Sequence, residues 1–487
     1  MKPQVLSKMG RRTTEPPISW LMHAALSRPK LISLAAGFTD NTALPVAEAR
    51  TALNQVLRSP KTGQPALQYG LTAGDLALRK LTAAHLRKLD WGGTPCRRPK
   101  NQGRRHAVPP EIYSTERLLI TSGSQQLLYL TAEALCNEGD IVLVEDPTYF
   151  VFLGILQSRG LRARAVRLER DGLDLAHLEK VLTSRKRSGE LRRVKFFYLV
   201  SYFQNPTGIT TSFEKKRGLL KLLRKFERAA GHSIYLLEDA AYRELRFQKN
   251  NQAQSSISTP SPRPSGARAG ARAGARGFEF ETTGLLTSPP SSLGRGEGEV
   301  KSALAVPGAA ERVIYAGTYS KPFATGVRVG YGILPKPLFT AMKHIKGNHD
   351  FGTSNLLQHL VVRALASGIY GRHVARLQKR YAHKARVMKL AIKKHFPPAV
   401  EWWEPEGGLY FWARLPRGLA TGMKSKIFST ALKNDVLYVP GELCYADDPA
   451  RRKPNHEMRI SFGSASEKDI REGIARLGAV LRKFLTQ

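Results

Sequence analysis

Short apolar runs with the composition of β-strands alternate with longer segments of helical period through the middle of this 487-residue chain. We expect strands at 117–121, 141–145, 195–200, 234–238 and 313–316, and helices at 124–136 and 213–228. This alternation favours an α/β fold with a mostly parallel sheet, because parallel strands need a crossover connection that a helix supplies. Ligands gather beyond the carboxyl ends of such strands, so the residues that follow these runs are candidates for a shared site.

The length of the chain predicts more than one domain. From residue 348 the pattern is helical for about fifty residues, and shorter strands and helices follow after residue 400. The last segment, 467–485, is amphipathic. We therefore expect an N-terminal segment, 1–60, that packs with a small domain, a large domain at 61–370, and a C-terminal small domain at 371–487.

Two stretches interrupt the globular pattern. Residues 92–110 are rich in Gly, Pro and Arg, and residues 249–307 are rich in Ser, Pro, Gly and Ala. The second stretch contains the repeat GARAGARAGAR at 266–276. We interpret both as insertions and expect the second to be disordered, because it can bury too little apolar surface to offset the entropy of ordering. The alternative is that the Arg repeat binds nucleic acid or a partner.

The formal charge of +38 raises the question of nucleic-acid binding. Residues 92–110 contribute five of these charges and residues 249–301 contribute three, so most of the charge is spread over the rest of the chain. There is no zinc-finger spacing and no basic leucine zipper. A general bias toward arginine explains this pattern better than a recognition surface, and specific nucleic-acid binding is not expected.

The sequence predicts a cytoplasmic protein without a membrane span. No apolar run approaches eighteen residues, and the basic start of the chain is not followed by an apolar signal segment. Cys96, Cys136 and Cys444 are far apart and show neither disulfide nor zinc spacing, so no metal site is expected.

A lysine among small residues follows the last predicted strand. Lys321 lies in the segment AGTYSKPFATGVRVG, seven positions before Arg328. A lysine amine near another cation is partly neutral and can condense with an aldehyde, while Arg328 and the hydroxyls of Thr318 and Ser320 can hold a phosphate. The combination suits pyridoxal 5'-phosphate (PLP), although any solvated lysine on a loop could look similar in isolation.

Four further segments stand at strand ends. Thr121–Gln126 can present backbone N–H groups to a phosphate, or Ser can simply cap a helix. Glu145–Phe150 offers the aromatic ring of Tyr149 for stacking on a flat ligand or for the core. In 202–208 a proline and a glycine fix the backbone around Asn205. In 236–242 two apolar residues precede Glu238 and Asp239. The carboxylate of Asp239 could pair with a pyridinium nitrogen or cap a helix.

Taken together and in this order, these segments resemble the class I/II aminotransferases, which are PLP-dependent enzymes of fold type I. The segments 33–45 (SLAAGFTDNTALP), 121–126, 203–208 and 238–245 resemble the branch with 2-aminoadipate, aromatic and kynurenine aminotransferases and the MocR-like regulators. The resemblance implies a large domain with a mostly parallel seven-stranded sheet covered by helices and a smaller α+β domain built from both ends of the chain. It also implies PLP as the cofactor.

The resemblance assigns a role to each candidate residue. Lys321 would form the Schiff base and move protons, Asp239 would pair with the pyridinium nitrogen, and Asn205 and Tyr242 would bond to the phenolic oxygen. Tyr149 would stack on the ring. Gly37, Asn205 and Arg459 would contact the substrate, with Arg459 clamping its carboxylate. The phosphate would be held by Ser124, Gln125, Ser320, Arg328 and Thr318, and by Tyr69 from a second subunit, which implies a homodimer.

The implied activity is ping-pong transfer of an amino group from an α-amino acid to a 2-oxo acid. Candidate donors are 2-aminoadipate, aromatic and branched or apolar amino acids, and 2-oxoglutarate is the expected acceptor. The segment Pro17–Leu21 lacks a basic residue for an acidic side chain, and Trp20 and Phe38 favour apolar or aromatic donors. Thr325 stands where relatives often have proline. The alternatives are a PLP-dependent lyase or decarboxylase on the same scaffold, and a MocR-like regulator, for which the residues before Ser33 are too few to hold a DNA-binding domain.

Overall fold

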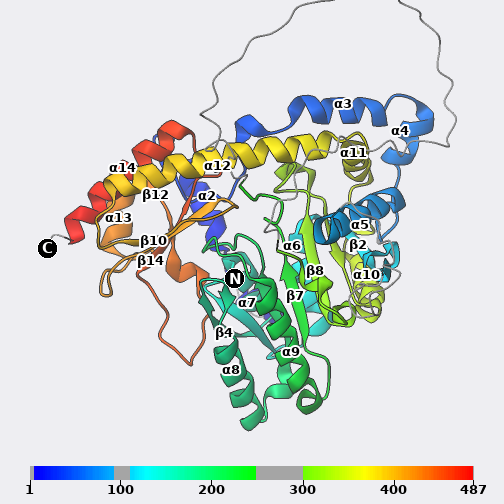
Figure 1. Ribbon diagram of the computed structural model, residues 1–487, viewed down its shortest axis with the longest axis horizontal. Coiled ribbons are helices and arrows are strands. Elements are labelled where there is room, and N and C mark those ends of the chain that lie inside the picture. The colour runs from blue at the N-terminus through cyan, green and yellow to red at the C-terminus, as the bar shows by residue number, and fades with distance from the viewer. Residues whose placement is uncertain (1–4, 93–109, 248–299, 486–487) are drawn as a thin grey trace, which may run out of the picture. The chain divides into compact units, whose positions relative to one another are not determined.

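A computed structural model describes residues 5–92, 110–247 and 300–485 of the chain (Figure 1). Most of each expected insertion therefore lies outside the described residues. The second insertion was expected to reach residue 307, whereas the described chain resumes at Val300 and forms a buried 3-10 helix at Ala303–Ala305.

A sheet of eight strands forms the centre of the structure, in the order β2-β9-β8-β7-β6-β3-β4-β5. The strands are β2 (Leu118–Thr121), β3 (Ile141–Asp146), β4 (Arg162–Glu169), β5 (Gly172–Leu173), β6 (Val194–Val200), β7 (Tyr235–Asp239), β8 (Val313–Thr318) and β9 (Gly330–Ile333). The run from β4 through β3, β6 and β7 to β8 is parallel, while β9 is antiparallel to both β8 and β2. The strand beyond the expected seven is the two-residue β5, which pairs antiparallel with β4.

Successive side chains along each strand point to opposite faces of the sheet, and this divides the core into two layers. On β6, Tyr198 and Phe196 pack in one cluster with α6 (Gly123–Leu135), α7 (Phe150–Ser158) and α10 (Lys336–Asp350). Phe197 and Leu199 pack in the other, with α5 (Leu76–Trp91), α8 (Leu175–Arg187) and α9 (Phe213–Ala230). Both faces of the sheet are thus covered, which explains why its central strands are apolar at almost every position.

A second, antiparallel sheet lies beside the last helices of the chain. It has the order β10-β11-β14-β13, formed by β10 (Glu401–Trp403), β11 (Tyr410–Arg414), β14 (Glu457–Ser461) and β13 (Val439–Pro440). The long helix α12 (Ile369–His395) runs alongside α14 (Glu467–Leu485), and α13 (Lys426–Lys433) packs against α14 (Figure 1).

The N-terminal elements, up to Leu67, contact both the central sheet region and the smaller sheet region. β1 (Ile32–Ser33) pairs in parallel with β12 (Val436–Leu437), and Trp20 of α2 (Pro17–Leu26) packs on Phe428 of α13 with ring centroids 6.0 Å apart. In contrast, α3 (Val46–Val56) and α4 (Pro60–Leu67) pack on α11 (Asn355–Ala366). The short α1 (Lys8–Arg12) lies against α7. The domain boundaries remain a prediction.

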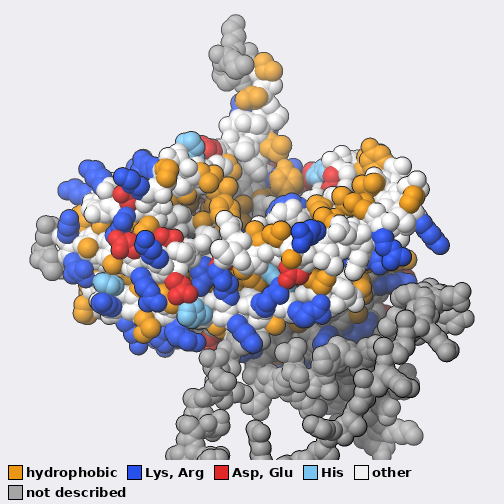
Figure 2. Space-filling view, turned by 90° about the horizontal axis from the view of Figure 1, so that it is seen from above, with side chains coloured by type: hydrophobic (Ala, Val, Ile, Leu, Met, Phe, Trp, Pro, Cys, Tyr) orange, Lys and Arg blue, Asp and Glu red, His pale blue; other side chains and the backbone are white. Residues whose placement is uncertain are grey.

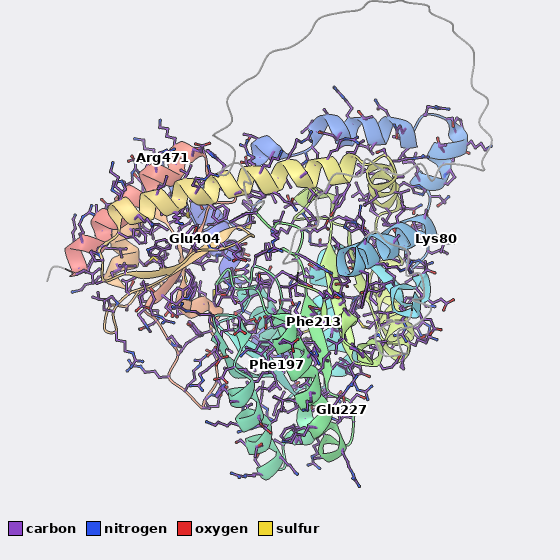
Figure 3. The ribbon with its side chains drawn as sticks, in the orientation of Figure 1. Lys80, Phe197, Phe213, Glu227, Glu404 and Arg471 are labelled. Carbon is purple, nitrogen blue, oxygen red and sulfur yellow. The ribbon has the colours of Figure 1, made fainter. Side chains whose placement is uncertain are left out.

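Charged side chains cover the face of the molecule shown in Figure 2 without forming one stripe there. In the face shown in Figure 2, lysines and arginines are scattered and mixed with acidic residues. Many are paired: Glu227, near the end of α9 (Figure 3), accepts a hydrogen bond from Arg312 Nε at 2.7 Å. No helix in the described part of the chain is long and apolar enough to cross a membrane. Within the same residues, no group of three or more His, Cys, Asp and Glu side chains could hold a metal ion.

Candidate active site

Lys321 follows β8 and reaches across to the N-terminal segment of the chain. Its Nζ donates to the carbonyl oxygen of Gly37 at 2.8 Å. Burial disfavours the charged amine, and the nearby cations Arg459 and Arg328 add repulsion, so the pKa of Lys321 falls from 10.5 to about 8. About a tenth of this amine is therefore neutral near pH 7, far more than for an ordinary lysine, as a nucleophilic lysine requires.

Asp239 ends β7 on the same side of the sheet as Tyr198. Only 4% of Asp239 is exposed; its carboxylate accepts from the hydroxyl of Tyr198 at 2.9 Å and from the backbone N–H of Ala241 at 3.1 Å. Burial raises its pKa from 3.8 to about 6, although these two hydrogen bonds and the charge of Lys321 oppose the rise. A buried carboxylate with so few partners favours a cationic ligand next to it.

A chain of polar side chains connects Arg459 in the middle of β14 with the residues that follow β6 and β7. Arg459, on β14, donates through Nη1 to Asn205 Oδ1 at 2.8 Å and through Nη2 to the carbonyl of Ala35 at 2.6 Å. The Asn205 amide lies 3.4 Å from the hydroxyl of Tyr242, which lies 3.0 Å from that of Tyr410. Asn205 follows β6 and Tyr242 follows β7, so residues far apart in sequence converge here.

The guanidinium of Arg459 is buried but incompletely satisfied. Arg459 is 1% exposed, and its Nε has no hydrogen-bond acceptor among the described residues. A buried guanidinium normally uses most of its donors, and a carboxylate suits the fork geometry. Arg459 can therefore accept an anionic ligand without a large rearrangement.

An anion cradle lies at the N-terminus of α6. The helix begins after Ser122 without a side-chain capping bond, and the first turn carries Ser124 and Gln125. Arg328 adopts a left-handed backbone (φ 48°) and brings its guanidinium over Gly123, where an added Cβ would lie 3.0 Å from Nη2. The buried hydroxyl of Ser320 lacks a partner among the described residues. These donors and the helix dipole suit a phosphate.

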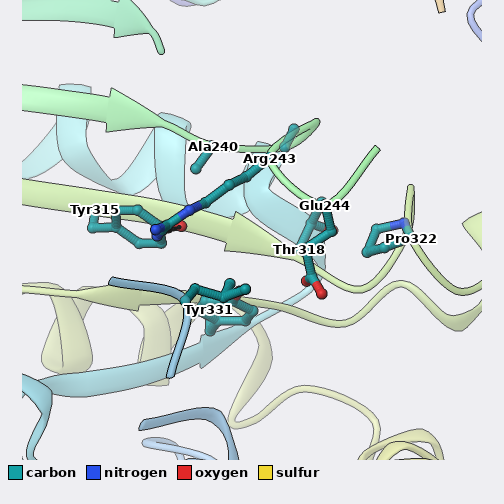
Figure 4. A pocket seen from close by; sticks show the side chains of 9 residues that line it. Ala240, Arg243, Glu244, Tyr315, Thr318, Pro322 and Tyr331 are labelled. Carbon is teal, nitrogen blue, oxygen red and sulfur yellow. Dashed lines mark hydrogen bonds between the residues drawn. The ribbon is translucent and has the colours of Figure 1, made fainter. Parts of the chain in front are cut away.

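The hydroxyl of Thr318 already makes hydrogen bonds within the protein. Its hydroxyl accepts from the Ser320 backbone N–H at 3.0 Å and lies 3.4 Å from the carbonyl of Val329. It also lines a small pocket of about 10 Å³ with Glu244 and Pro322 (Figure 4), room for about one water. Thr318 thus fixes the backbone that presents Ser320.

The remaining expected residues differ in position. Tyr149 precedes α7 and lies within electrostatic reach of Asp239, Arg459 and Arg328; burial raises its pKa. Gly37 lies against Tyr410, whose hydroxyl would be 2.9 Å from an added Cβ. Tyr69 is apart from them: it is 87% exposed, and its ring packs on Phe351.

Three neighbours of the site were missed by the sequence analysis: Tyr410, Tyr198 and Glu145. The pair Gly407-Gly408 before Tyr410 was a possible signal. Tyr198 stands inside a strand and gives no local signal, since its role depends on pairing with β7. Glu145 is buried, accepts from the Val200 N–H at 2.7 Å, and has a pKa raised by burial to about 8.

The site fits PLP by its own chemistry. A lysine with a lowered pKa and a buried carboxylate match an aldehyde and a pyridine nitrogen, and an anion cradle whose Ser320 hydroxyl has no partner among the described residues matches a phosphate. Together with the mostly parallel sheet, they define a PLP-dependent enzyme of fold type I.

Residues 29–477 match the family "Aminotransferase class I and II", and the chain belongs to this family. It is 29% identical to a 2-aminoadipate transaminase of Thermus thermophilus over 94% of this chain and 92% of the relative. It is 28% identical to aromatic-amino-acid aminotransferase 1 of Thermococcus litoralis over 93% of this chain and 88% of the relative. The crystal structure of Pyrococcus horikoshii kynurenine aminotransferase in complex with PMP aligns with a TM-score of 0.77, 27% identity, and coverage of 99% and 98%. The protein is a PLP-dependent transaminase.

Proposed function

We propose that this enzyme moves the amino group of an α-amino acid to a 2-oxo acid in two successive half-reactions, with 2-oxoglutarate as the acceptor. The observation that carries this proposal is the buried Arg459. Its Nε has no acceptor among the residues that the structure describes, and its charge is close enough to Lys321 to lower the pKa of that lysine. A carboxylate bound at Arg459 would thus lie near the reactive amine. Both the amino acid and the oxo acid carry such a carboxylate.

The residues around Lys321 would each bind a different part of the cofactor. In this proposal Lys321 would hold the cofactor through its aldehyde, Asp239 would pair with the ring nitrogen, and Tyr149 would stack on the ring. Asn205 and Tyr242 bind the ring oxygen, since both present polar atoms beside Arg459. The phosphate takes its donors from Ser124, Gln125, Thr318, Ser320, Arg328 and, across a dimer interface, Tyr69.

In this proposal Lys321 also takes the proton from the substrate Cα. When bound, the cofactor supplies a carbonyl group that takes up the amino group and an electron-poor ring that withdraws electrons from the substrate Cα. Asp239, kept ionised, maintains the positive charge on that ring. The Nζ of Lys321 accepts the proton of Cα, because its lowered pKa places it in the range that suits a general base near neutral pH. Arg459 holds the α-carboxylate, which fixes the direction of the Cα–H bond.

Aromatic and apolar amino acids are the donors that the surroundings of the site support, with 2-aminoadipate as the acidic candidate. Phe38 directly follows Gly37, whose carbonyl binds Lys321, and is 40% exposed, so it offers apolar surface on this segment. Trp20 packs on Phe428. The first turns of α2, from Pro17 to Leu21, carry no basic side chain for an acidic substrate.

We also propose a cytoplasmic homodimer whose sites lie at the subunit interface. Tyr69 and Phe351 are 87% and 74% exposed although both are large aromatics, which suits a surface covered by a partner. Mixing Lys321→Ala with Tyr69→Ala after subunit exchange should restore activity, since each mixed dimer keeps one site free of both substitutions. No recovery in a demonstrated mixed dimer would contradict the shared site.

A panel of amino acids tests the reaction itself. The holoenzyme is mixed with aromatic, branched, small and acidic amino acids, and the loss of its visible absorption band and the oxo acid formed are measured for each. Aromatic or apolar donors should yield one oxo acid per enzyme site without 2-oxoglutarate and turn over only with it. Release of carbon dioxide or of the substrate side chain, without amino transfer, would instead identify a lyase or decarboxylase.

A further inference from the structure

Tyr410 touches two parts of the site at once. It opens β11, is 1% exposed, and places its hydroxyl 3.0 Å from that of Tyr242. The face of its ring lies under the guanidinium of Arg459, 4.3 Å from ring centroid to Cζ. The rings of Tyr410 and Tyr242 meet edge to face, at 80°. Tyr410 therefore contacts both a proposed cofactor ligand and the proposed carboxylate ligand.

The hydroxyl of Tyr410 can fix the direction of the Tyr242 O–H bond. A tyrosine hydroxyl has one hydrogen to donate and two lone pairs. The Asn205 amide lies at 3.4 Å from the Tyr242 oxygen and can supply one donor. If the Tyr410 hydroxyl donates a second hydrogen bond to the Tyr242 oxygen, both lone pairs of that oxygen are engaged. The O–H bond of Tyr242 then points away from Asn205 and Tyr410. If Tyr242 donated to Tyr410 instead, its only hydrogen would be engaged there and could not be donated to the cofactor.

The ring of Tyr410 can fix the plane of the Arg459 guanidinium. A cation over an aromatic face is attracted by the ring quadrupole, most strongly where water is excluded. Phe150 is the more distant aromatic neighbour, with its centroid 5.5 Å from the same Cζ. Asn205 and the Ala35 carbonyl hold the two terminal nitrogens. Tyr410 thus completes the support of the guanidinium from its face.

We propose that Tyr410 is a positioning residue with two separable parts: its hydroxyl donates to Tyr242 and aims that O–H at the cofactor ring oxygen, and its ring holds Arg459 for the substrate carboxylate. This inference rests on the proposed roles of Tyr242 and Arg459. It does not depend on which amino acid is the donor. Hydroxyl and ring can be tested apart, because Tyr410→Phe removes only the first and Tyr410→Leu removes both.

The hydroxyl is tested by titrating the visible absorption of the holoenzyme with pH. A donor to the ionised ring oxygen lowers the proton affinity of the chromophore, so loss of the donor should raise its apparent pKa. Tyr410→Phe should raise this apparent pKa by about half to one unit, the effect of one ordinary hydrogen bond. Tyr242→Phe should raise it at least as much, and Tyr410→Phe added to Tyr242→Phe should add nothing. The control is Tyr438→Phe, which removes another buried hydroxyl, bonded to the Thr421 carbonyl at 2.8 Å, and should leave the titration unchanged.

The ring is tested by the apparent affinity for the amino acid. Tyr410→Phe should leave KM within about twofold of the parent, whereas Tyr410→Leu should raise KM by roughly 3- to 30-fold as a buried cation–π contact is lost. A titration of Tyr410→Phe identical to that of the parent, while Tyr242→Phe shifts, would overturn the role of the hydroxyl. Equal KM values for Tyr410→Phe and Tyr410→Leu would overturn that of the ring. If Tyr242→Phe itself leaves the titration unchanged, the proposed role of Tyr242 fails, and the inference about the hydroxyl fails with it.

Discussion

Lys321 Nζ lies 2.8 Å from the carbonyl oxygen of Gly37, a residue 284 positions away in the sequence. The hydrogen bond holds the amine between the end of β8 and the segment that follows β1. Because Arg459 bonds to Ala35 in the same segment, the amine and the proposed carboxylate ligand share one support. Displacement of this segment should therefore affect cofactor attachment and substrate binding together.

The pH dependence of cofactor attachment follows from the lowered pKa of Lys321. Only the neutral amine attacks an aldehyde, so the rate at which apoenzyme recombines with PLP should rise with pH and level off above about 8 rather than above 10.5. Asp239→Asn should move the midpoint to lower pH, because it removes a charge that favours the protonated amine. Stopped-flow absorbance of the recombination measures this. A midpoint near 10 would contradict the burial of the amine.

Asp239 should set a lower pH limit for cofactor binding. Its pKa is raised to about 6, so the carboxyl loses its charge as the pH falls through about 6, and the affinity for PLP should fall over the same range. Tyr198→Phe removes a hydrogen bond that lowers this pKa and should shift the fall to higher pH. Asp239→Asn should reduce kcat/KM on the order of 100-fold or more. Equilibrium fluorescence titration with PLP at several pH values measures the affinities; an unchanged profile in Tyr198→Phe would count against the assignment.

Arg459→Lys should weaken substrate binding and spare the cofactor. The lysine keeps the charge but cannot make the forked contact, so KM for the amino acid and the oxo acid should both rise roughly 10- to 100-fold. Affinity for PLP should change less than threefold. The matched control is Arg414→Lys on the neighbouring strand β11, whose side chain bonds to Glu457 and should leave KM unchanged. Steady-state kinetics with both substrates give the comparison.

Gly37→Ala should be partly rescued by a second substitution. The added Cβ would meet the Tyr410 hydroxyl at 2.9 Å, closer than such atoms pack, so either the backbone that binds Lys321 or the Tyr410 side chain must move, and kcat should fall. Tyr410→Phe removes that hydroxyl, so the double variant Gly37→Ala, Tyr410→Phe should be more active than Gly37→Ala alone. Activity that simply falls by the product of the two single effects would contradict the contact.

Much of the sheet could be predicted from the sequence because its strands are buried on both faces. The expected strand 141–145 is β3, one residue longer, and the expected segment 467–485 is α14. In contrast, β9 was missed: its four residues include two glycines, and it is defined by pairing between β2 and β8. Pairing of this kind is not encoded in a local pattern.

The candidate residues could be named from strand ends, but their partners could not. Glu238 and Asp239 are adjacent acids on β7, and alternation sends them to opposite faces. Glu238 forms an ion pair with Lys216 of α9 at 3.0 Å, both side chains being 0% exposed, whereas Asp239 bonds to Tyr198. The sequence analysis singled out Asp239 by resemblance. The roles of Tyr198 and Tyr410 depend on the register between strands, which only the three-dimensional structure provides.

The central claim is that Lys321 carries the cofactor, and chemical trapping tests it most directly. Holoenzyme reduced with sodium borohydride is digested, and the modified peptide is located by mass spectrometry. We expect the cofactor mass on Lys321, its retention in the exposed control Lys336→Ala, and its absence in Lys321→Ala. Trapping of the cofactor on another lysine in the parent enzyme, or undiminished trapping in Lys321→Ala, would contradict this account.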